Sequence, residues 1–148
     1  MDADEMSGEA RRQIAELPVR YAHLIDHDET ERLGELFEKD VVFVVRDQPP
    51  VVGRESVISM LRSGHVAFGQ GRPGFHRHDI TNVVITQISS SEVAMSCYFV
   101  VLTPDGLDNW GRYEDVVVQT GDGWRFARRT VFTDGYSPTS WHPAAGKP

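Results

Sequence analysis

The chain has 148 residues, of which 40% are hydrophobic and 25% charged, a composition ordinary for one globular domain able to bury a core and a cavity. Its formal net charge of −7, concentrated before Asp40, argues against a nucleic-acid partner, because phosphate binding needs a basic surface. No apolar run is long enough to cross a membrane, the acidic first residues are unlike a secretory signal, and a lone Cys97 excludes an internal disulfide, so we expect a cytoplasmic protein.

Helical periodicity opens the chain after a tail at residues 1–7. From about Glu9, apolar residues recur at three- and four-residue spacing and predict a helix that Pro18 should kink or restart. Asp26 falls off the apolar stripe, at the margin of the face that this helix packs. Asp28, followed three residues later by Glu31, is typical of a capping box and predicts a second helix to about Lys39.

Short elements follow. The β-branched run Val41–Val45 predicts a strand, which ends at Gln48 and two prolines. Residues Glu55–Arg62 predict a third helix. The glycine-rich segment Ser63–Gly74 predicts a flexible loop, which we interpret as a lid.

The second half of the chain predicts four strands joined by short turns. Their expected ranges are Phe75–Gln87, Glu92–Thr103, Asn109–Thr120 and Trp124–Thr133, followed by an irregular tail from Gly135. Short turns imply antiparallel neighbours, and helices followed by a meander predict an α+β fold whose single-domain core covers about residues 9–134. The second strand is apolar on both faces, which indicates a partner subunit and hence a homodimer or homotrimer.

The stretch from Gly74 to Asn82 carries the candidate chemistry. Strand alternation should place His76, His78, Ile80 and Asn82 on one face, a poor composition for a core and a suitable one for a pocket. Because histidine can take and return a proton near neutral pH, we hypothesise that His78 is a general base oriented by Asp26.

Two alternatives use the same residues. Asp26 and His78 could form a buried structural pair in a pocket without catalysis. His76 and His78 could also be half of a metal site, since alternate strand positions can direct two imidazoles at one ion. A cupin-like site would need a glutamate where Thr81 and Asn82 stand, so we assign no metal and no other cofactor.

Between Ile14 and Asp134 the sequence resembles the SnoaL-like branch of the nuclear-transport-factor-like superfamily. The segments that carry the resemblance are Tyr21-Ala-His-Leu-Ile-Asp26, Leu36-Phe37 with Asp40, Gly53-Arg-Glu-Ser, His78-Asp-Ile-Thr-Asn82, Gly111-Arg-Tyr-Glu-Asp115 and Gly123-Trp-Arg-Phe-Ala-Arg-Arg129. The branch includes polyketide cyclases, scytalone dehydratase, a bile-acid dehydratase, hexachlorocyclohexane dehydrochlorinase and small subunits of aromatic-ring dioxygenases. The resemblance implies a cone-shaped α+β barrel, with three N-terminal helices packed on a strongly curved, mainly antiparallel sheet.

The resemblance also implies roles for single residues. It matches Asp26 and His78 to the catalytic pair, Tyr21 to an assisting residue and Arg129 to an arginine that can enter the pocket. There Arg129 could hold an anionic group of the substrate. It places five further residues on the pocket wall as substrate-binding positions: Phe43, His76, Phe99, Val101 and Tyr113. Some dehydratases carry another His or Asp near the position of Val101, and this chain does not.

Together these observations predict a cofactor-free lyase, isomerase or cyclase. It would act on a hydrophobic, cyclic small molecule by abstracting a proton in an internal pocket. The alternative is a non-catalytic binding or accessory subunit, similar to the small subunit of a ring-hydroxylating dioxygenase.

Overall fold

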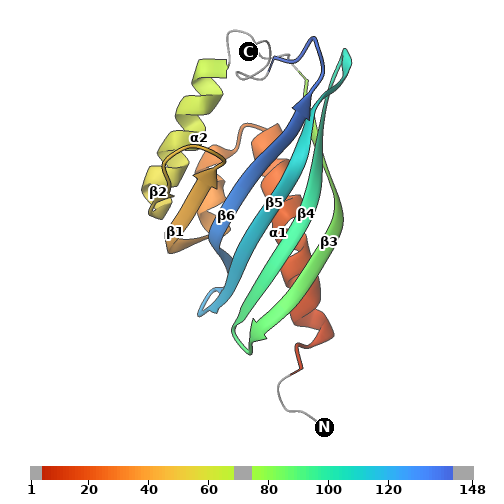
Figure 1. Cartoon of the computed structure of the whole chain (residues 1–148). Coiled ribbons are helices and arrows are strands. Elements are labelled where there is room, and N and C mark those ends of the chain that lie inside the picture. The colour runs from red at the N-terminus through yellow and green to blue at the C-terminus, as the bar shows by residue number, and fades with distance from the viewer. Residues whose placement is uncertain (1–4, 69–74, 142–148) are drawn as a thin grey trace.

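The computed structural model describes residues 5–68 and 75–141 and confirms the α+β class. Its elements in chain order are α1 (Gly8–Asp26), η1 (Thr30–Glu35), β1 (Phe37–Val45), β2 (Val51–Val52), α2 (Arg54–Phe68), β3 (Arg77–Ser89), β4 (Glu92–Thr103), β5 (Gly106–Thr120) and β6 (Gly123–Tyr136). In Figure 1 the long strands β3 to β6 curve in front of α1, and α2 lies beside β1 and β2. No helix in the described part of the chain has the length and apolar character needed to cross a bilayer.

The six strands form one mixed sheet in the order β2-β1-β6-β5-β4-β3. Only β1 and β6 run parallel, and every other neighbouring pair is antiparallel, so the expectation of a mainly antiparallel sheet is confirmed. The sheet is open, with β2 and β3 at its edges, and in this respect the expected barrel is corrected.

Helix α1 begins at the N-cap Ser7, whose hydroxyl accepts a hydrogen bond from the amide of Ala10 at 3.1 Å. Its buried stripe includes Ile14, Leu17 and Tyr21, as the periodicity predicts. Pro18 lies inside the helix without ending it. The last helical residue is Asp26, and α1 packs mainly against β3 and also contacts β6.

The predicted second helix is wrong in length and type. Asp28 has a φ of 63°, so it cannot begin an α-helix, and only a 3-10 turn follows at Thr30–Glu35. The N-cap of this turn is Glu29 rather than the expected Asp28, and Glu31 pairs with Arg62 of α2. The chain enters β1 early because Phe37 is fully buried and pairs with Phe126 of β6.

The other boundaries differ where tertiary contacts extend an element. Helix α2 continues to Phe68, so residues 63–68 are helical, whereas the remainder of the predicted lid, 69–74, lies outside the described residues. Strand β4 has the predicted bounds. Strand β6 extends into the predicted tail because Tyr136 pairs with Asn109 of β5.

A bulge in β3 breaks the predicted alternation. Asn82 has a φ of 55°, and the register with β4 shifts between Thr81 and Val84. Consequently Asn82 is exposed, and the side chains that turn inward are His76, His78 and Ile80 before the bulge and Val83 and Ile85 after it. The expectation that Asn82 shares the face of the two histidines is wrong.

Candidate active site

A cavity of about 770 Å³ lies against the inner face of the sheet. Six of the residues expected at the site line it: Tyr21, Phe43, His78, Phe99, Val101 and Tyr113. Much of the remaining wall is made by residues that the sequence did not single out: Val45, Arg46, Asp47, Gln48, Leu61, Asn109, Val131, Thr133, Tyr136 and Trp141.

The strand register explains which residues reach the cavity. Inward-facing residues of adjacent strands stand side by side in rows across the sheet. The first row is His78, Val101, Asn109 and Tyr136; the second contains Phe99, Gly111 and Thr133; the third is Cys97, Tyr113, Val131 and Val45; and the fourth is Met95, Asp115, Arg129 and Phe43. Most of the strand residues around the cavity come from the first three rows.

Gly111 leaves room for the Phe99 ring in the second row. A Cβ atom there would lie 1.9 Å from the carbonyl oxygen of Phe132 and 2.8 Å from Cζ of Phe99. The space is instead filled by the Phe99 ring, which stacks on Tyr113 with ring centroids 4.7 Å apart. The glycine at this position therefore allows the rings of Phe99 and Tyr113 to form an aromatic wall on the inner face of the sheet.

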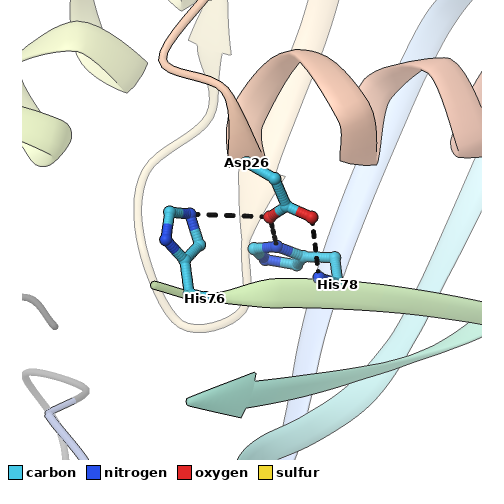
Figure 2. Close-up of side chains that lie close together, drawn as sticks. All are labelled: Asp26, His76 and His78. Carbon is cyan, nitrogen blue, oxygen red and sulfur yellow. Dashed lines mark hydrogen bonds and ion pairs between the residues drawn. The ribbon is translucent and has the colours of Figure 1, made fainter. Parts of the chain in front are cut away.

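Asp26 and His78 meet at the edge of the cavity. The carboxylate extends from the last turn of α1 toward the start of β3, as Figure 2 shows. Its Oδ1 lies 2.7 Å from Nδ1 of His78, and its Oδ2 accepts a hydrogen bond of 2.9 Å from the backbone amide of His78. Side-chain exposure is 5% for Asp26 and 15% for His78, so the carboxylate is shielded while the imidazole still borders the cavity.

The electrostatics of Asp26 follow from these contacts. Burial acts to raise the pKa of Asp26, but the hydrogen bonds from the ring and the backbone amide of His78 outweigh burial and lower that pKa. Asp26 therefore stays ionised at neutral pH. An ionised acceptor at Oδ1 selects the His78 tautomer that carries its proton on Nδ1 and leaves Nε2 free to accept a proton.

His76 occupies a different position from the one expected. It does not line the cavity, and its side chain is only 6% exposed. Its Nε2 lies 3.5 Å from Oδ1 of Asp26, the same oxygen that contacts His78. The His76 ring therefore lies against Asp26 rather than on the cavity wall, and its expected role in substrate binding stays a prediction.

Among the described residues, the side chains of Asp26, His76 and His78 form a group that could hold a metal ion. One ligand atom from each of Asp26, His76 and His78 can be chosen so that all lie within 4.8 Å of one another. Two ligands of one zinc ion, each at about 2.0–2.1 Å in tetrahedral geometry, stand roughly 3.4 Å apart. The 2.7 Å between Nδ1 and Oδ1 is instead the length of a charge-assisted hydrogen bond.

Tyr21 and Tyr113 form the wall beyond the Asp26–His78 pair. Their rings meet edge to face with centroids 5.9 Å apart, and each residue is about 95% buried in the fold, with exposures of 5% and 4%. Burial raises the pKa of Tyr21 to about 12 and that of Tyr113 well above its ordinary value. Both phenols therefore remain protonated at neutral pH and can act as hydrogen-bond donors.

Arg129 does not enter the cavity. It is fully buried in the fourth row, where Nε and Nη2 each donate to a carboxylate oxygen of Asp115 at 2.9 Å. Its neighbour Arg128 is exposed on the opposite face, as strand alternation predicts. Because Arg129 has no exposed surface and is not part of the cavity lining, the expectation that it enters the pocket and holds an anionic group of the substrate is corrected.

The structure also reveals wall residues outside the predicted segments. Trp141 lines the cavity because buried Asp108 accepts hydrogen bonds from its backbone amide at 3.1 Å and from the hydroxyl of Ser140 at 2.6 Å. Arg46 lines the cavity from the end of β1. No local pattern marks these positions, since they reach the site only through strand pairing and the course of the chain after β6.

Comparison with known proteins identifies the family. The model of the SnoaL-like domain matches residues 6–130. The chain belongs to the SnoaL-like domain family. This confirms the resemblance seen in the sequence, whereas the comparison with curated proteins finds no match.

Solved structures share the fold of this SnoaL-like protein. A protein assigned as scytalone dehydratase from Novosphingobium aromaticivorans is 24% identical, with a TM-score of 0.72 over 86% of this chain and 85% of that one. The beta subunit assigned to an aromatic-ring-hydroxylating dioxygenase of the same species is 26% identical, with a TM-score of 0.67 over 90% and 94%. A Catenulispora acidiphila protein in complex with S-DNPA is 26% identical, with a TM-score of 0.73 over 86% and 96%.

Proposed function

We propose that this SnoaL-like protein is a cofactor-independent enzyme in which His78 abstracts a proton from an apolar, cyclic small molecule. The outcome would be elimination, isomerisation or ring closure, in a cytoplasmic homodimer or homotrimer. The observation that carries the proposal is the 2.7 Å contact between Asp26 and a histidine that lines a cavity of about 770 Å³.

The catalytic step follows from the hydrogen bond. With its Nδ1 proton held by Asp26, His78 presents the lone pair of Nε2 as the base. When Nε2 takes a proton from carbon, the ring becomes an imidazolium, and the adjacent carboxylate stabilises that charge. A base positioned in this way contributes roughly 10²–10⁴-fold to the rate.

The rest of the wall suits a substrate with an apolar ring system and an oxygen function. Phe99 and Val101 offer apolar surface, and Tyr21 also lines the cavity, where its phenol would donate a hydrogen bond to a leaving or carbonyl oxygen. The relative in complex with S-DNPA supports small-molecule binding by this fold, and the relative assigned as scytalone dehydratase supports dehydratase-like chemistry.

The proposal can be tested without knowing the substrate. Cyclic ketones such as 2-tetralone and 2-decalone are incubated with the protein in deuterated buffer, and hydrogen exchange beside the carbonyl is followed by NMR. We expect exchange above the buffer rate and its loss in His78→Ala, whereas His23→Ala, which changes an exposed histidine of α1, should behave as wild type. Equal exchange in wild type and His78→Ala would exclude His78 as the base.

A second candidate function is that of an accessory subunit. The observation that favours it is the similarity to a dioxygenase beta subunit along 90% of this chain. In that case the chain should show no His78-dependent exchange and should form a stable complex with a ring-hydroxylating large subunit, measured by co-elution in size-exclusion chromatography.

A further inference from the structure

The most heavily buried charge in the described part of the chain lies next to the cavity wall. Arg129 has no exposed surface, and its guanidinium carbon sits over three aromatic rings: Tyr113 at 3.9 Å from the centroid, Phe126 at 4.3 Å and Tyr21 at 4.4 Å. Two of these rings, Tyr21 and Tyr113, border the cavity, and Phe126 does not. The cation therefore lies behind the phenols, on the side away from the cavity.

Stability alone does not account for this arrangement. A buried ion pair loses much of its attraction to the cost of desolvation, and apolar replacements of similar volume are often neutral or stabilising. Nη1 of Arg129 has no hydrogen-bond partner among the described residues, which adds a further desolvation cost. A purely structural role could be met at lower cost by two apolar side chains at these positions.

Charge and position suggest another role. Asp115 fixes Arg129 through two hydrogen bonds of 2.9 Å, so the guanidinium cannot swing toward solvent or into the cavity. Its positive charge opposes the effect of burial on the pKa of Tyr21 and of Tyr113. A phenol beside a fixed cation is a stronger hydrogen-bond donor, and it stabilises negative charge that develops on an oxygen bonded to it.

We infer that the Arg129–Asp115 pair is a positioning and electrostatic support for Tyr21 and Tyr113, which together form a binding site for an oxyanion on the cavity wall. This inference rests on the proposed function and specifies its substrate class. The substrate would be a carbonyl compound, and proton abstraction by His78 would generate an enolate whose oxygen accepts hydrogen bonds from the two phenols. The electron pair of the broken C–H bond moves to that oxygen, and the proton resides on Nε2 of His78.

The probe for this site is 4-nitrophenol, whose absorbance distinguishes its neutral and ionised forms. We expect the bound probe to ionise at a pH at least about one unit below that of the free probe, which corresponds to a tenfold preference for the oxyanion. In Arg129→Met/Asp115→Leu, which removes both charges together, this shift should be lost. Arg129→Lys keeps the charge without the two-pronged contact and should retain part of the shift.

Circular dichroism and thermal melting show whether the double variant is folded. Arg128→Met, which removes a positive charge on the exposed face of the same strand, is the control for loss of charge alone. A folded double variant that retains the full shift would overturn the inference, as would a wild-type protein that does not favour the ionised probe. If the double variant does not fold, Tyr113→Phe is the deciding variant, because it should reduce the shift and an unchanged shift would also overturn the inference. Loss of His78-dependent exchange with an intact shift would instead count against the base alone.

Discussion

The Oδ1 oxygen of Asp26 and the Nδ1 nitrogen of His78 lie 2.7 Å apart, although 52 residues separate them in the sequence. The second oxygen of the same carboxylate is bonded to the His78 amide at 2.9 Å, so the contact fixes the backbone as well as the ring. Asp26 therefore joins the end of α1 to the start of β3. It also fixes the tautomer of the His78 imidazole that borders the cavity.

Replacing Asp26 with Asn should reduce exchange of the bound ketone by roughly 10²–10⁴-fold, the range of general-base catalysis. An amide cannot stabilise the imidazolium as a carboxylate does, even though its oxygen can still accept one hydrogen bond. NMR exchange rates measure the effect. The matched control is Asp79→Asn, an exposed carboxylate next to His78 on the outer side of β3, which should keep the wild-type rate.

The same contact should make the fold sensitive to acid. The pKa of Asp26 is lowered in the folded protein, so its stabilising contribution is present above the unfolded value of about 3.9 and is lost as the pH falls through the folded value. We expect Asp26→Asn to melt below wild type at about pH 6 and the difference in Tm to shrink below about pH 4. A difference in Tm that stays constant down to acid pH would show that the carboxylate charge is unimportant.

Gly111→Ala should destabilise the protein by about 2–4 kcal/mol, because the new methyl group would collide with the Phe132 carbonyl and the Phe99 ring. Urea denaturation followed by fluorescence gives the free energy of unfolding. Gly121→Ala is the control, since nothing lies within 4 Å of a Cβ at that turn, and its free energy of unfolding should change little. Equal effects of the two substitutions would exclude steric overlap as the cause.

Enlarging Val101 tests whether the cavity receives the ligand. Val101→Phe adds volume on the cavity wall and should abolish binding of 2-tetralone, measured by calorimetry, while the protein stays folded. Val100→Phe places the same side chain on the opposite face of β4 and should leave binding intact. Equal loss in both variants would indicate general damage to the strand.

The outer face of the sheet should form a subunit interface. Val84 and Tyr98 are 58% and 53% exposed there, which is consistent with the partner subunit expected from the apolar second strand of the meander. Tyr98→Arg should convert the oligomer to a monomer in size-exclusion chromatography with light scattering. Val52→Arg, on edge strand β2, should leave the mass unchanged, and a monomeric wild-type protein would refute the prediction.

Sequence patterns predicted the elements that depend on interactions between residues near one another in the chain. Periodicity gave α1, and β-branched runs between turns gave β4 with its bounds, because side-chain burial follows the repeat of each element. The same approach failed at Asp28, where one residue with φ of 63° replaces the expected helix start, and at Asn82, where a bulge reverses the alternation. Asp and Asn adopt positive φ more often than most residues, but a single sequence does not show which of them will do so.

By itself, the sequence determined the fold class and the family resemblance, because those depend on repeats and motifs along the chain, and it suggested Asp26 and His78 as a pair. That the two side chains meet was decided by the tertiary structure, which brings the end of α1 onto the start of β3. Only the tertiary structure decided that His76 turns to Asp26, that Arg129 is bound by Asp115 behind the cavity wall, and that Trp141 closes part of that wall. The physical reason is that a buried charged or polar side chain must contact a partner that offsets the free-energy cost of its burial. That partner is set by strand register and chain path rather than by neighbours in the sequence.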